Sequence, residues 1–489
     1  MLRKEEGVVG MDNMILILNY SDEFSMEIVR RLRAEQVRAC IAARDTTAEQ
    51  VRALAPRGLI FSGEAVDADA MLDEALLQLD IPVLALGHTA HALLRSLGGA
   101  SVDVAIHEKK ALVQYGESEL FAHVREGERY LKQVKTLMLP TGVRGTASAA
   151  GCTIAFEVPE KRQYGVQFEL ERNDPDGTTI LMNFARNICG CSAWWTIDAA
   201  RACAEHRLAD AAQAGGYALC AVSGGVDSTL AALLTRRAFG ERMAAVFVDT
   251  GLMREGEPEE IQQAFEALHI PLRCVDRSQE ILARLAHKCS GEEKQRVIVS
   301  SLYEEMMRQS ASMEGRMTMV LGTNYSDFLG SGSSAPYWGA EGVTTVEPLM
   351  DLLKEEVRAV ARTLNMQESL VERKPFPALG LGARIVGEVT AERLHALRTA
   401  DAIFREEIRM AGMEKKLYKH FPVLIGGETN RRELMVLRAV TLSGAQLIPA
   451  RLPHDLVERT VQRIMEAMPT VIRVLYDETP TPVGKETFS

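Results

Sequence analysis

The sequence predicts an α/β protein with two doubly wound parallel-sheet domains, followed by a small α+β domain. Three observations carry this prediction. Short apolar runs alternate with helix-like patterns in two long stretches of the chain, which is typical of parallel sheets covered by helices. The last part of the chain carries the helices and strands of a smaller module. With 489 residues, the chain is also too long for one hydrophobic core, so about three domains are expected.

The first stretch begins with a buried strand and then repeats helix and strand. Strands are predicted at Met14–Asn19, Gly58–Gly63, 81–87 and 163–169, and helices at 22–35 and 88–97. Residues 1–10 are charged and lack the apolar segment of a secretory signal, so we expect a loose tail there. An alanine-rich helix at Ile197–Gln213 is expected to lead into the second domain.

The second stretch opens with an apolar strand, a Ser-Gly-Gly turn and the start of a helix. Tyr217–Val222 reads as the strand, and a helical pattern begins near Leu230. Backbone N–H groups in such a turn converge, and the helix dipole adds positive potential, so the loop is suited to phosphate. The loop lacks the lysine of the Walker pattern. Asp227, next to Ser228, is a candidate ligand for Mg²⁺ held together with phosphates.

Two further strand ends are expected to border the same site. Met243–Asp249 is a strand followed by Thr250 and Gly251, and ligands of doubly wound sheets lie beyond the carboxyl ends of strands. We therefore expect Val248, Asp249 and Gly251 to line a nucleotide site. The alternative is that Asp249 caps the next helix. A strand at 317–324 places Gly322 and Thr323 at its end.

The last module is predicted to hold helices and strands in a mixed order. Helices are expected at 392–410 and 455–468, and strands at 421–425, 435–440 and Val471–Tyr476.

Composition and charge restrict the classes of partner. The apolar fraction of 47% and charged fraction of 25% are those of an ordinary soluble protein. A net charge of −11 argues against nucleic acid as a general partner. The eight cysteines are scattered, and the spacing of Cys189 and Cys191 fits neither a zinc site nor a redox pair. With no apolar run long enough to span a bilayer, we expect a reduced, cytoplasmic protein with no membrane partner.

The Ser-Gly-Gly loop resembles the signature of the ATP pyrophosphatases, the PP-loop superfamily. The residues that carry this resemblance are Ser223, Gly224, Gly225, Val226, Asp227 and Ser228. In that family the loop holds the β- and γ-phosphates of ATP while a substrate oxygen attacks the α-phosphate. The resemblance implies Mg²⁺ and ATP as cofactors, with release of pyrophosphate. The alternative is a chance Ser-Gly-Gly turn.

Several later segments resemble the GMP synthase family. Val248, Asp249 and Gly251 match its Val-Asp-Asn-Gly segment, and Gly322 and Thr323 its adenine pocket. Residues 345–349, followed by Lys354, match Val-Glu-Pro-Leu…Lys, and residues 375–384, which end in Arg384, give the longest match. Residues 292–296 resemble the family's Pro-Glu-x-Lys-Arg-Lys. The resemblance implies Asp227, Ser228, Lys354 and Arg384 as catalytic residues, with Arg384 stabilising the transferred phosphoryl group. The alternatives are a structural Arg384 and a solvent-facing pair, Lys294 and Arg296.

The first stretch resembles a class I glutamine amidotransferase domain that has lost its catalytic residues. Gly87 stands where the family has its nucleophilic cysteine, Glu169 where it has histidine, and Glu171 where its orienting glutamate sits. Residues 62–64 replace a Gly-Gly pair, and no cysteine occurs from Ile41 to Gly151. Because that chemistry needs a thiolate and an imidazole, we expect no glutamine hydrolysis. The domain is then a scaffold, a docking face or a ligand sensor.

The segments that select the acceptor in this family are altered. Residues 333–342 lack the family's histidine pair and lysine, residues 424–430 replace its Val-Gly-Val-Gln-Gly-Asp segment, and residues 481–489 replace its Lys-Pro-Pro-Ala-Thr-Ile-Glu-Trp-Glu tail. The activating half of the protein therefore matches the family, whereas the acceptor-selecting half departs from it.

Together, these features predict an ATP-dependent, AMP-forming C–N ligase that aminates an oxo-purine nucleotide, xanthosine monophosphate to GMP. Ammonia would come from solution or a separate glutaminase subunit. The expected domains are residues 1–196, 197–386 and 387–489, the last resembling a dimerisation domain, which implies a homodimer. The alternatives are another acceptor, sulfur as the nucleophile, or a non-catalytic ATP-binding regulator.

Overall fold

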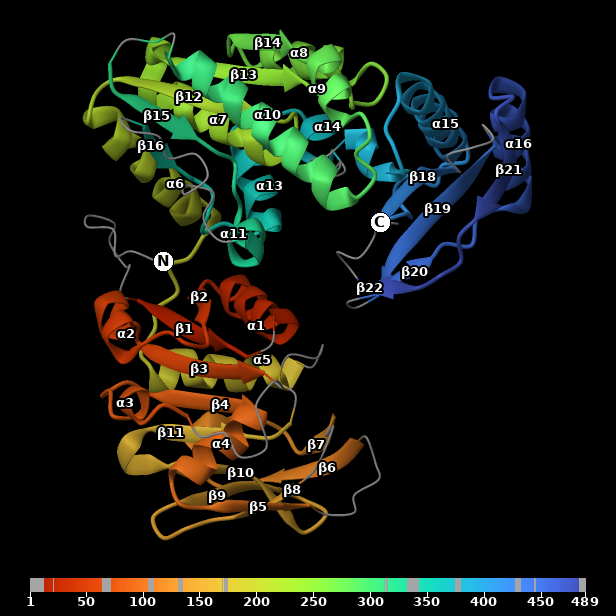
Figure 1. Cartoon of the computed structure of the whole chain (residues 1–489). Helices are drawn as coiled ribbons and strands as arrows, with labels where there is room; N and C mark the ends of the chain where they lie inside the picture. Colours follow the sequence, from red (N-terminus) through yellow and green to blue (C-terminus); the bar gives the residue numbers. More distant parts are fainter. Residues whose placement is uncertain are drawn as a thin grey trace. The chain divides into compact units, whose positions relative to one another are not determined.

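The computed structural model divides the chain into two compact units, Met1–Ala200 and Arg201–Ser489, which are described one at a time (Figure 1). The structure describes residues 13–20, 22–63, 72–103, 110–130, 135–168, 170, 175–311, 313, 315–331, 343–373, 380–426, 432–443 and 446–482.

The first unit is built on a nine-stranded sheet with the strand order β2-β1-β3-β4-β11-β10-β9-β6-β7, beside a two-stranded sheet of β5 and β8. Strands β2, β1, β3, β4 and β11 run parallel to one another. Strands β10, β9, β6 and β7 then continue the sheet, each antiparallel to its neighbour. The strands are β1 Met14–Asn19, β2 Arg38–Ala43, β3 Gly58–Gly63, β4 Val83–Gly87, β5 Ala100–Asp103, β6 Lys110–Tyr115, β7 Gly127–Tyr130, β8 Lys135–Met138, β9 Arg144–Ala149, β10 Cys152–Val158 and β11 Gln163–Val166. The helices are α1 Asp22–Ala34, α2 Ala48–Leu54, α3 Glu74–Leu77, α4 His88–Ser96 and α5 Pro175–Met182, with a π-helix at Asn183–Ile188.

The central strands of this unit are continuous apolar runs because both of their faces are covered. Leu16 and Phe61 pack in one cluster with Leu93 of α4. On the other face, a Cβ atom at Gly58 would lie 2.4 Å from Cys189 Sγ, so a side chain here would collide with the segment that follows α5. Helix α6, Ile197–Gln213, crosses from the first unit into the second.

The second unit begins with a five-stranded, all-parallel sheet in the order β14-β13-β12-β15-β16. Leu219 of β12 packs with Met306 of α10, whereas the next residue, Cys220, meets Thr235 of α7. Successive strand residues face opposite sides, so helices cover both faces. The strands are β12 Tyr217–Val222, β13 Met243–Asp249, β14 Leu272–Asp276, β15 Met317–Val320 and β16 Val343–Val346. The helices are α7 Val226–Phe239, α8 Glu257–Ala267, α9 Ser278–Leu285, α10 Gly291–Ala311, α11 Tyr325–Ser331, α13 Lys354–Thr363 and α14 Glu368–Val371.

The chain order of this sheet reverses at its central strand. From β12 the chain moves outward to β13 and β14 and then returns to β15, on the other side of β12. Loops that follow β12 and β15 therefore diverge and open a crevice at the carboxyl ends of the strands, which is where doubly wound sheets bind ligands.

The rest of the second unit is a mixed sheet in the order β17-β18-β19-β20-β22, with β21 paired to β19. Helices α15 and α16 pack on it through Leu397, Phe404 and Ile464, which share one core with Leu424 and Leu437 of the sheet. The elements are a 3₁₀ turn at Gly380–Arg384, β17 Ile385–Val386, α15 Ala391–Met410, β18 Lys419–Gly426, β19 Glu433–Ser443, β20 Gln446–Pro449, α16 His454–Ala467, β21 Val471–Tyr476 and β22 Thr481–Pro482.

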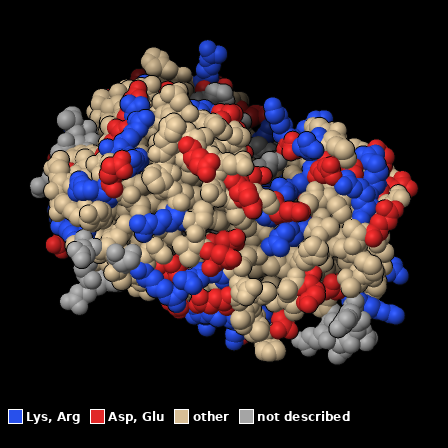
Figure 2. Space-filling view, turned by 90° about the horizontal axis from the view of Figure 1, so that it is seen from above, with Lys and Arg blue, Asp and Glu red and all other residues tan. Residues whose placement is uncertain are grey.

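The predicted fold class is confirmed, although several elements were not predicted, such as β2 and β14. The first sheet carries the antiparallel extension of β10, β9, β6 and β7, which was not predicted. The strand expected at 317–324 ends at Val320, because the chain leaves the sheet to form the site described below. Among the described residues, no helix is long and apolar enough to cross a membrane. On the face shown in Figure 2, Lys and Arg side chains are interspersed with Asp and Glu.

Candidate active site

The loop between β12 and α7 has the backbone geometry that the sequence predicts. Gly224 has a φ of +80°, a conformation that favours glycine. A Cβ atom at Gly224 would lie 2.4 Å from the side chain of Ile261. Gly225 precedes the first residue of α7, and no side chain caps that helix end. The first N–H groups of α7 are therefore left to a ligand or to water.

Two serines fix the shape of the loop. The Ser223 N–H donates to Ser228 Oγ at 3.1 Å, and the two hydroxyl oxygens are also 3.1 Å apart. Ser228 Oγ lies 3.2 Å from the Gly225 carbonyl oxygen, to which Thr229 Oγ1 donates at 2.9 Å. These contacts join the first and last residues of the loop 223–228. They therefore fix its backbone as a single turn at the start of α7.

Asp227 points to a lysine and an amide from distant segments. Lys354, the first residue of α13, forms an ion pair with its carboxylate, and Asn324 Nδ2 donates to the other oxygen at 3.4 Å. The Asp227 side chain is 18% exposed. Asp327 lies nearby, and burial, together with the Asp227 carboxylate, raises the pKa of Asp327.

A magnesium ion fits this donor set when phosphate is also present. Mg²⁺ commonly takes one or two carboxylates and completes its shell with phosphate oxygens and water, and Asp227 offers a partly exposed carboxylate at the loop. No group of three His, Cys, Asp or Glu side chains able to hold a metal occurs among the described residues. An ion here would therefore depend on the nucleotide for its remaining ligands.

Gly322 and Thr323 lie against the loop. A Cβ atom at Gly322 would be 2.7 Å from the Ser228 nitrogen, so only glycine allows the end of β15 to approach α7 this closely. Thr323 Oγ1 donates to Glu347 Oε1 at 2.7 Å, and both side chains are buried. The structure thus brings together the loop and the segment after β15, while their nucleotide-binding role stays a prediction.

Asp249 shapes the turn that follows β13. Its carboxylate accepts a 2.8 Å hydrogen bond from the Gly251 N–H, and Gly251 has a φ of +72°. Helix α8 begins only at Glu257 and follows Gly256. The alternative that Asp249 caps the next helix is therefore wrong. Val248, one residue earlier, is buried in the strand.

Arg384 is buried against the last part of the chain. It donates to Asp401 Oδ1 at 3.1 Å, and its guanidinium lies over the ring of Phe421. Burial, the largest effect, lowers the pKa of Arg384 to about 10. These contacts are with α15 and β18. The role of Arg384 toward a phosphoryl group stays a prediction.

Two cationic residues on α10, Lys294 and Arg296, differ in exposure. Lys294 is buried and donates to the carbonyl oxygen of Ile385 at 2.5 Å, and burial lowers its pKa to about 8. The Arg296 side chain is 81% exposed and forms an ion pair with Glu292 on the same helix. The expectation that this pair faces solvent thus holds for Arg296 alone.

Sequence patterns missed two residues that hold the loop. Arg373 donates to the carbonyl oxygen of Gly224 at 3.1 Å and to Glu257 Oε1 at 2.8 Å, and Asn324 contacts Asp227. Asn324 directly follows Gly322 and Thr323, and this neighbourhood in the sequence could have identified it as a site residue. Arg373 lies far along the chain next to the segment 374–379, and no local spacing marks it.

In the first unit, the sharp turn of the amidotransferase resemblance is present but bears no nucleophile. Gly87 joins β4 to α4 with a φ of +60° and a ψ of −126°. Thr89 braces the turn by donating to the Phe61 carbonyl oxygen at 2.8 Å and accepting from the Leu86 N–H at 2.9 Å. Cys40 is buried on β2, separated from β4 by β1 and β3. Glu64, Glu169, Glu171 and residues 333–342, 374–379, 427–430 and 483–489 lie outside the described residues, as does the tail 1–10.

Known proteins resemble this chain over nearly its whole length. The family model described as NAD synthase matches residues 209–408. The chain is 34% identical to a protein of Geobacillus kaustophilus named GMP synthase [glutamine-hydrolyzing], over 96% of this chain and 98% of that protein. It is 35% identical to a protein of the same name from Symbiobacterium thermophilum, over the same shares of the two chains. A solved structure from Thermoplasma acidophilum, described as a putative GMP synthase subunit, covers 36% of this chain and 93% of its own, with 22% identity and a TM-score of 0.33.

Proposed function

The chain belongs to the GMP synthase family, and from this premise we propose that it aminates an oxo-purine nucleotide in an ATP-dependent, AMP-forming reaction. The chain is an ATP-dependent C–N ligase of this family. The acceptor that we propose is xanthosine monophosphate, and the product is GMP.

The observation that carries the proposal is the loop of residues 223–228 at the reversal point of a parallel sheet. Its glycines leave the backbone open, its first helical N–H groups have no side-chain cap, and Asp227 lies beside Lys354. A loop of this kind binds anions, and a carboxylate next to it is suited to a magnesium–phosphate complex. ATP and Mg²⁺ are therefore the cofactors of the proposal.

In the proposed first step, the carbonyl oxygen of the acceptor attacks the α-phosphorus of ATP. The bond between the α-phosphorus and the bridging oxygen breaks, and pyrophosphate leaves. The loop N–H groups hold the β- and γ-phosphates, and Lys354 contributes a positive charge beside them. Magnesium, when bound, would neutralise part of the phosphate charge. Ammonia then attacks the activated carbon, loses a proton, and displaces AMP.

We further propose that the nitrogen does not come from glutamine hydrolysed by this chain. Gly87 occupies the turn that would present the nucleophile, and a glycine has no side chain with which to attack. Free ammonia or a separate glutaminase subunit is the source in this proposal. The first domain would then act as a scaffold, docking face or sensor. We also propose the domain limits 1–196, 197–386 and 387–489 and a homodimer, by analogy with the family.

The test is an assay of pyrophosphate release by the full chain with ATP and Mg²⁺. Xanthosine monophosphate plus ammonium is expected to give pyrophosphate, AMP and GMP in equal amounts, whereas glutamine is expected to give no product. The Asp227→Ala variant serves as the control for contaminating activity. Release with a different purine nucleotide would contradict the proposed acceptor, and binding of ATP without turnover on any acceptor would contradict the ligase. Product formation from glutamine would contradict the loss of the glutaminase.

A further inference from the structure

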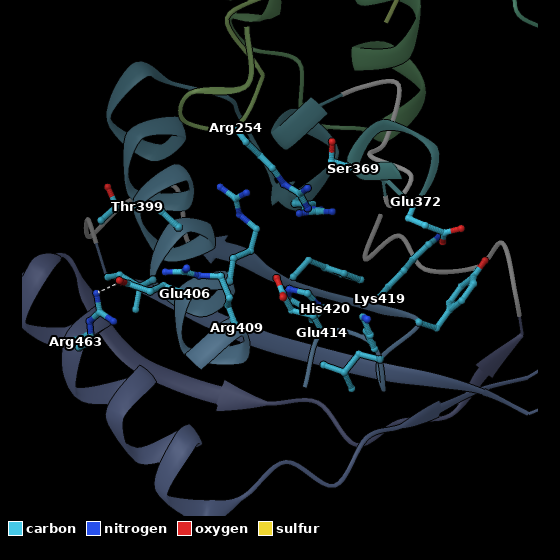
Figure 3. A pocket seen from close by; sticks show the side chains of 18 of the residues that line it. Arg254, Ser369, Glu372, Thr399, Glu406, Arg409, Glu414, Lys419, His420 and Arg463 are labelled. Carbon is cyan, nitrogen blue, oxygen red and sulfur yellow. Dashed lines mark hydrogen bonds and ion pairs between the residues drawn. The ribbon is translucent and has the colours of Figure 1, made fainter. Parts of the chain in front are cut away.

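The second unit contains a large cavity with an unusual excess of positive charge. Its volume is about 1320 Å³, larger than the several hundred Å³ that small-molecule sites commonly have. Side chains from α13, α14, α15, α16, the start of β18 and the turn after β13 line it. Those labelled in Figure 3 surround one hollow, and the dashed line joins Arg463 to Glu406.

Charge on the lining is strongly unbalanced. Among the described residues that line the cavity, six arginines and two lysines face only three glutamates. Two buried carboxylates pair with the lining from beneath, Asp401 with Arg384 and Glu407 with Arg463, and they still leave an excess of three positive charges. Because the chain as a whole carries a net charge of −11, this excess is a local feature of the cavity.

The base of the cavity holds three guanidinium groups around a single carboxylate. Arg254, Arg384 and Arg405 all form ion pairs with Asp401, whose side chain is 1% exposed. Arg254 and Arg384 are themselves largely buried. Burial lowers the pKa of both arginines even though Asp401 and the nearby Glu257 favour their charged forms, so positive charge is held here at a cost. An anion bound at this point would remove that cost.

The rim of the cavity adds two exposed cations. Arg409, at the end of α15, and Lys415, in the loop before β18, are exposed, and neither takes part in an ion pair within the described part of the chain. Both line the same cavity as the buried arginines. A ligand reaching from the base to the rim would meet positive charge at both ends.

The cavity is distinct from the loop of residues 223–228, although Arg384, one of the predicted catalytic residues, lines it. None of the described residues that line it belongs to the loop 223–228 or to the acceptor-selecting segments 333–342, 424–430 and 481–489. Arg254, however, connects its base to the loop: the Arg254 N–H donates to Glu257, Glu257 accepts from Arg373, and Arg373 donates to the Gly224 carbonyl oxygen.

We propose that this cavity is a second ligand site, which binds a small molecule carrying two phosphate groups. Each phosphate monoester brings a charge of about −1.5 to −2 at neutral pH, so two of them offset the excess of three positive charges. Arginine forks suit phosphate oxygens because they donate paired hydrogen bonds, and the volume accommodates a carbon skeleton between the phosphates.

Isothermal titration calorimetry of the full chain with fructose 1,6-bisphosphate tests this proposal, with fructose as the phosphate-free control. We expect one site per chain for the bisphosphate, weaker binding as salt rises, and no binding of fructose. Arg409→Glu and Lys415→Glu are each expected to weaken binding about tenfold or more. Lys416→Glu makes the same charge change at an exposed neighbour outside the described lining, and is expected to leave affinity within about twofold.

Failure to bind the bisphosphate at millimolar concentration would overturn the proposal, as would an equal loss of affinity in the Lys416→Glu control. Competition with nucleotides shows at which site the bisphosphate binds. Displacement of the bisphosphate by a non-hydrolysable ATP analogue would assign the binding to the loop. Displacement by xanthosine monophosphate would make the cavity part of the acceptor site. Either displacement contradicts a separate site, and retention of the bisphosphate in the presence of both supports it.

Discussion

Asp227 is the residue around which the loop's proposed chemistry is arranged. It lies in the first turn of α7, where a carboxylate is favoured by the helix dipole, and it is held from two sides by Lys354 and Asn324. The ion pair is partly exposed, so it contributes little to stability. We infer that this ion pair positions a carboxylate and a cation beside the bound phosphates.

Replacing Lys354 by alanine is expected to lower the rate of pyrophosphate release about 100- to 1000-fold, because a preorganised positive charge near the phosphates is lost. The free energy of unfolding is expected to change by less than about 1 kcal/mol. Steady-state kinetics and denaturant titration measure the two effects. Lys416→Ala, an exposed lysine far along the chain, is the control. A rate within tenfold of wild type would show that Lys354 does not act on the phosphates.

Gly224 offers a test of the loop's backbone. Gly224→Ala forces an L-residue into a left-handed conformation, which costs about 1–2 kcal/mol, and pushes its Cβ into Ile261. Gly256→Ala is the matched control, because Gly256 has a similar φ of +73° with no atom within 4 Å of the added Cβ. Binding of an ATP analogue is expected to be lost in the first variant and kept in the second. Equal affinity in both variants would mean that the loop does not hold the phosphates.

At the scale of elements, the turn from β4 into α4 keeps its sharp geometry without a nucleophile. The same turn positions His91, which is buried in α4 and whose ring lies 6.3 Å from that of His88. Burial first, and then the positive neighbours His88, Lys135 and Arg95, lower the pKa of His91 to about 4. His91 is therefore neutral in the folded unit at physiological pH.

This histidine predicts a pH dependence of the first unit's stability. Between pH 6.5 and about 4 the unfolded chain binds a proton at His91 that the folded chain does not, so stability falls as pH falls through that window. Across this window the first unit loses at most on the order of 3 kcal/mol of its free energy of unfolding. His91→Gln is expected to flatten this slope, whereas His454→Gln, at an exposed position, should keep it. Urea titrations followed by the fluorescence of Trp194 and Trp195 measure it; unchanged slopes in His91→Gln would contradict a neutral His91.

Elements were predictable where one local pattern decided them. Strands such as β1, β3 and β13 are uninterrupted apolar runs with both faces buried, and their observed limits match the predicted ones. The antiparallel strands β6 and β7 were not predicted, because β6 is largely exposed and alternates only weakly. The contacts of Arg373 and Asn324 depend on segments distant in sequence, so no spacing could reveal them.

At the scale of the whole molecule, the second unit holds the loop of residues 223–228 and a basic cavity in one compact body. Hydrogen bonds through Arg373, Glu257 and Arg254 join the backbone of the loop to the base of that cavity. In the first unit, Gly87 occupies the sharp turn between β4 and α4. Activation by ATP is thus the central claim, and the source of nitrogen is a separate one.

An isotope-transfer experiment shows whether the acceptor oxygen attacks the α-phosphorus of ATP. The full chain is incubated with ATP, Mg²⁺, ammonium and xanthosine monophosphate that carries ¹⁸O at its 2-carbonyl, and the products are examined by mass spectrometry. Attack on the α-phosphorus at the loop of residues 223–228 predicts that the label appears in AMP and that pyrophosphate stays unlabelled. Label in inorganic phosphate or pyrophosphate, or formation of ADP, would contradict it.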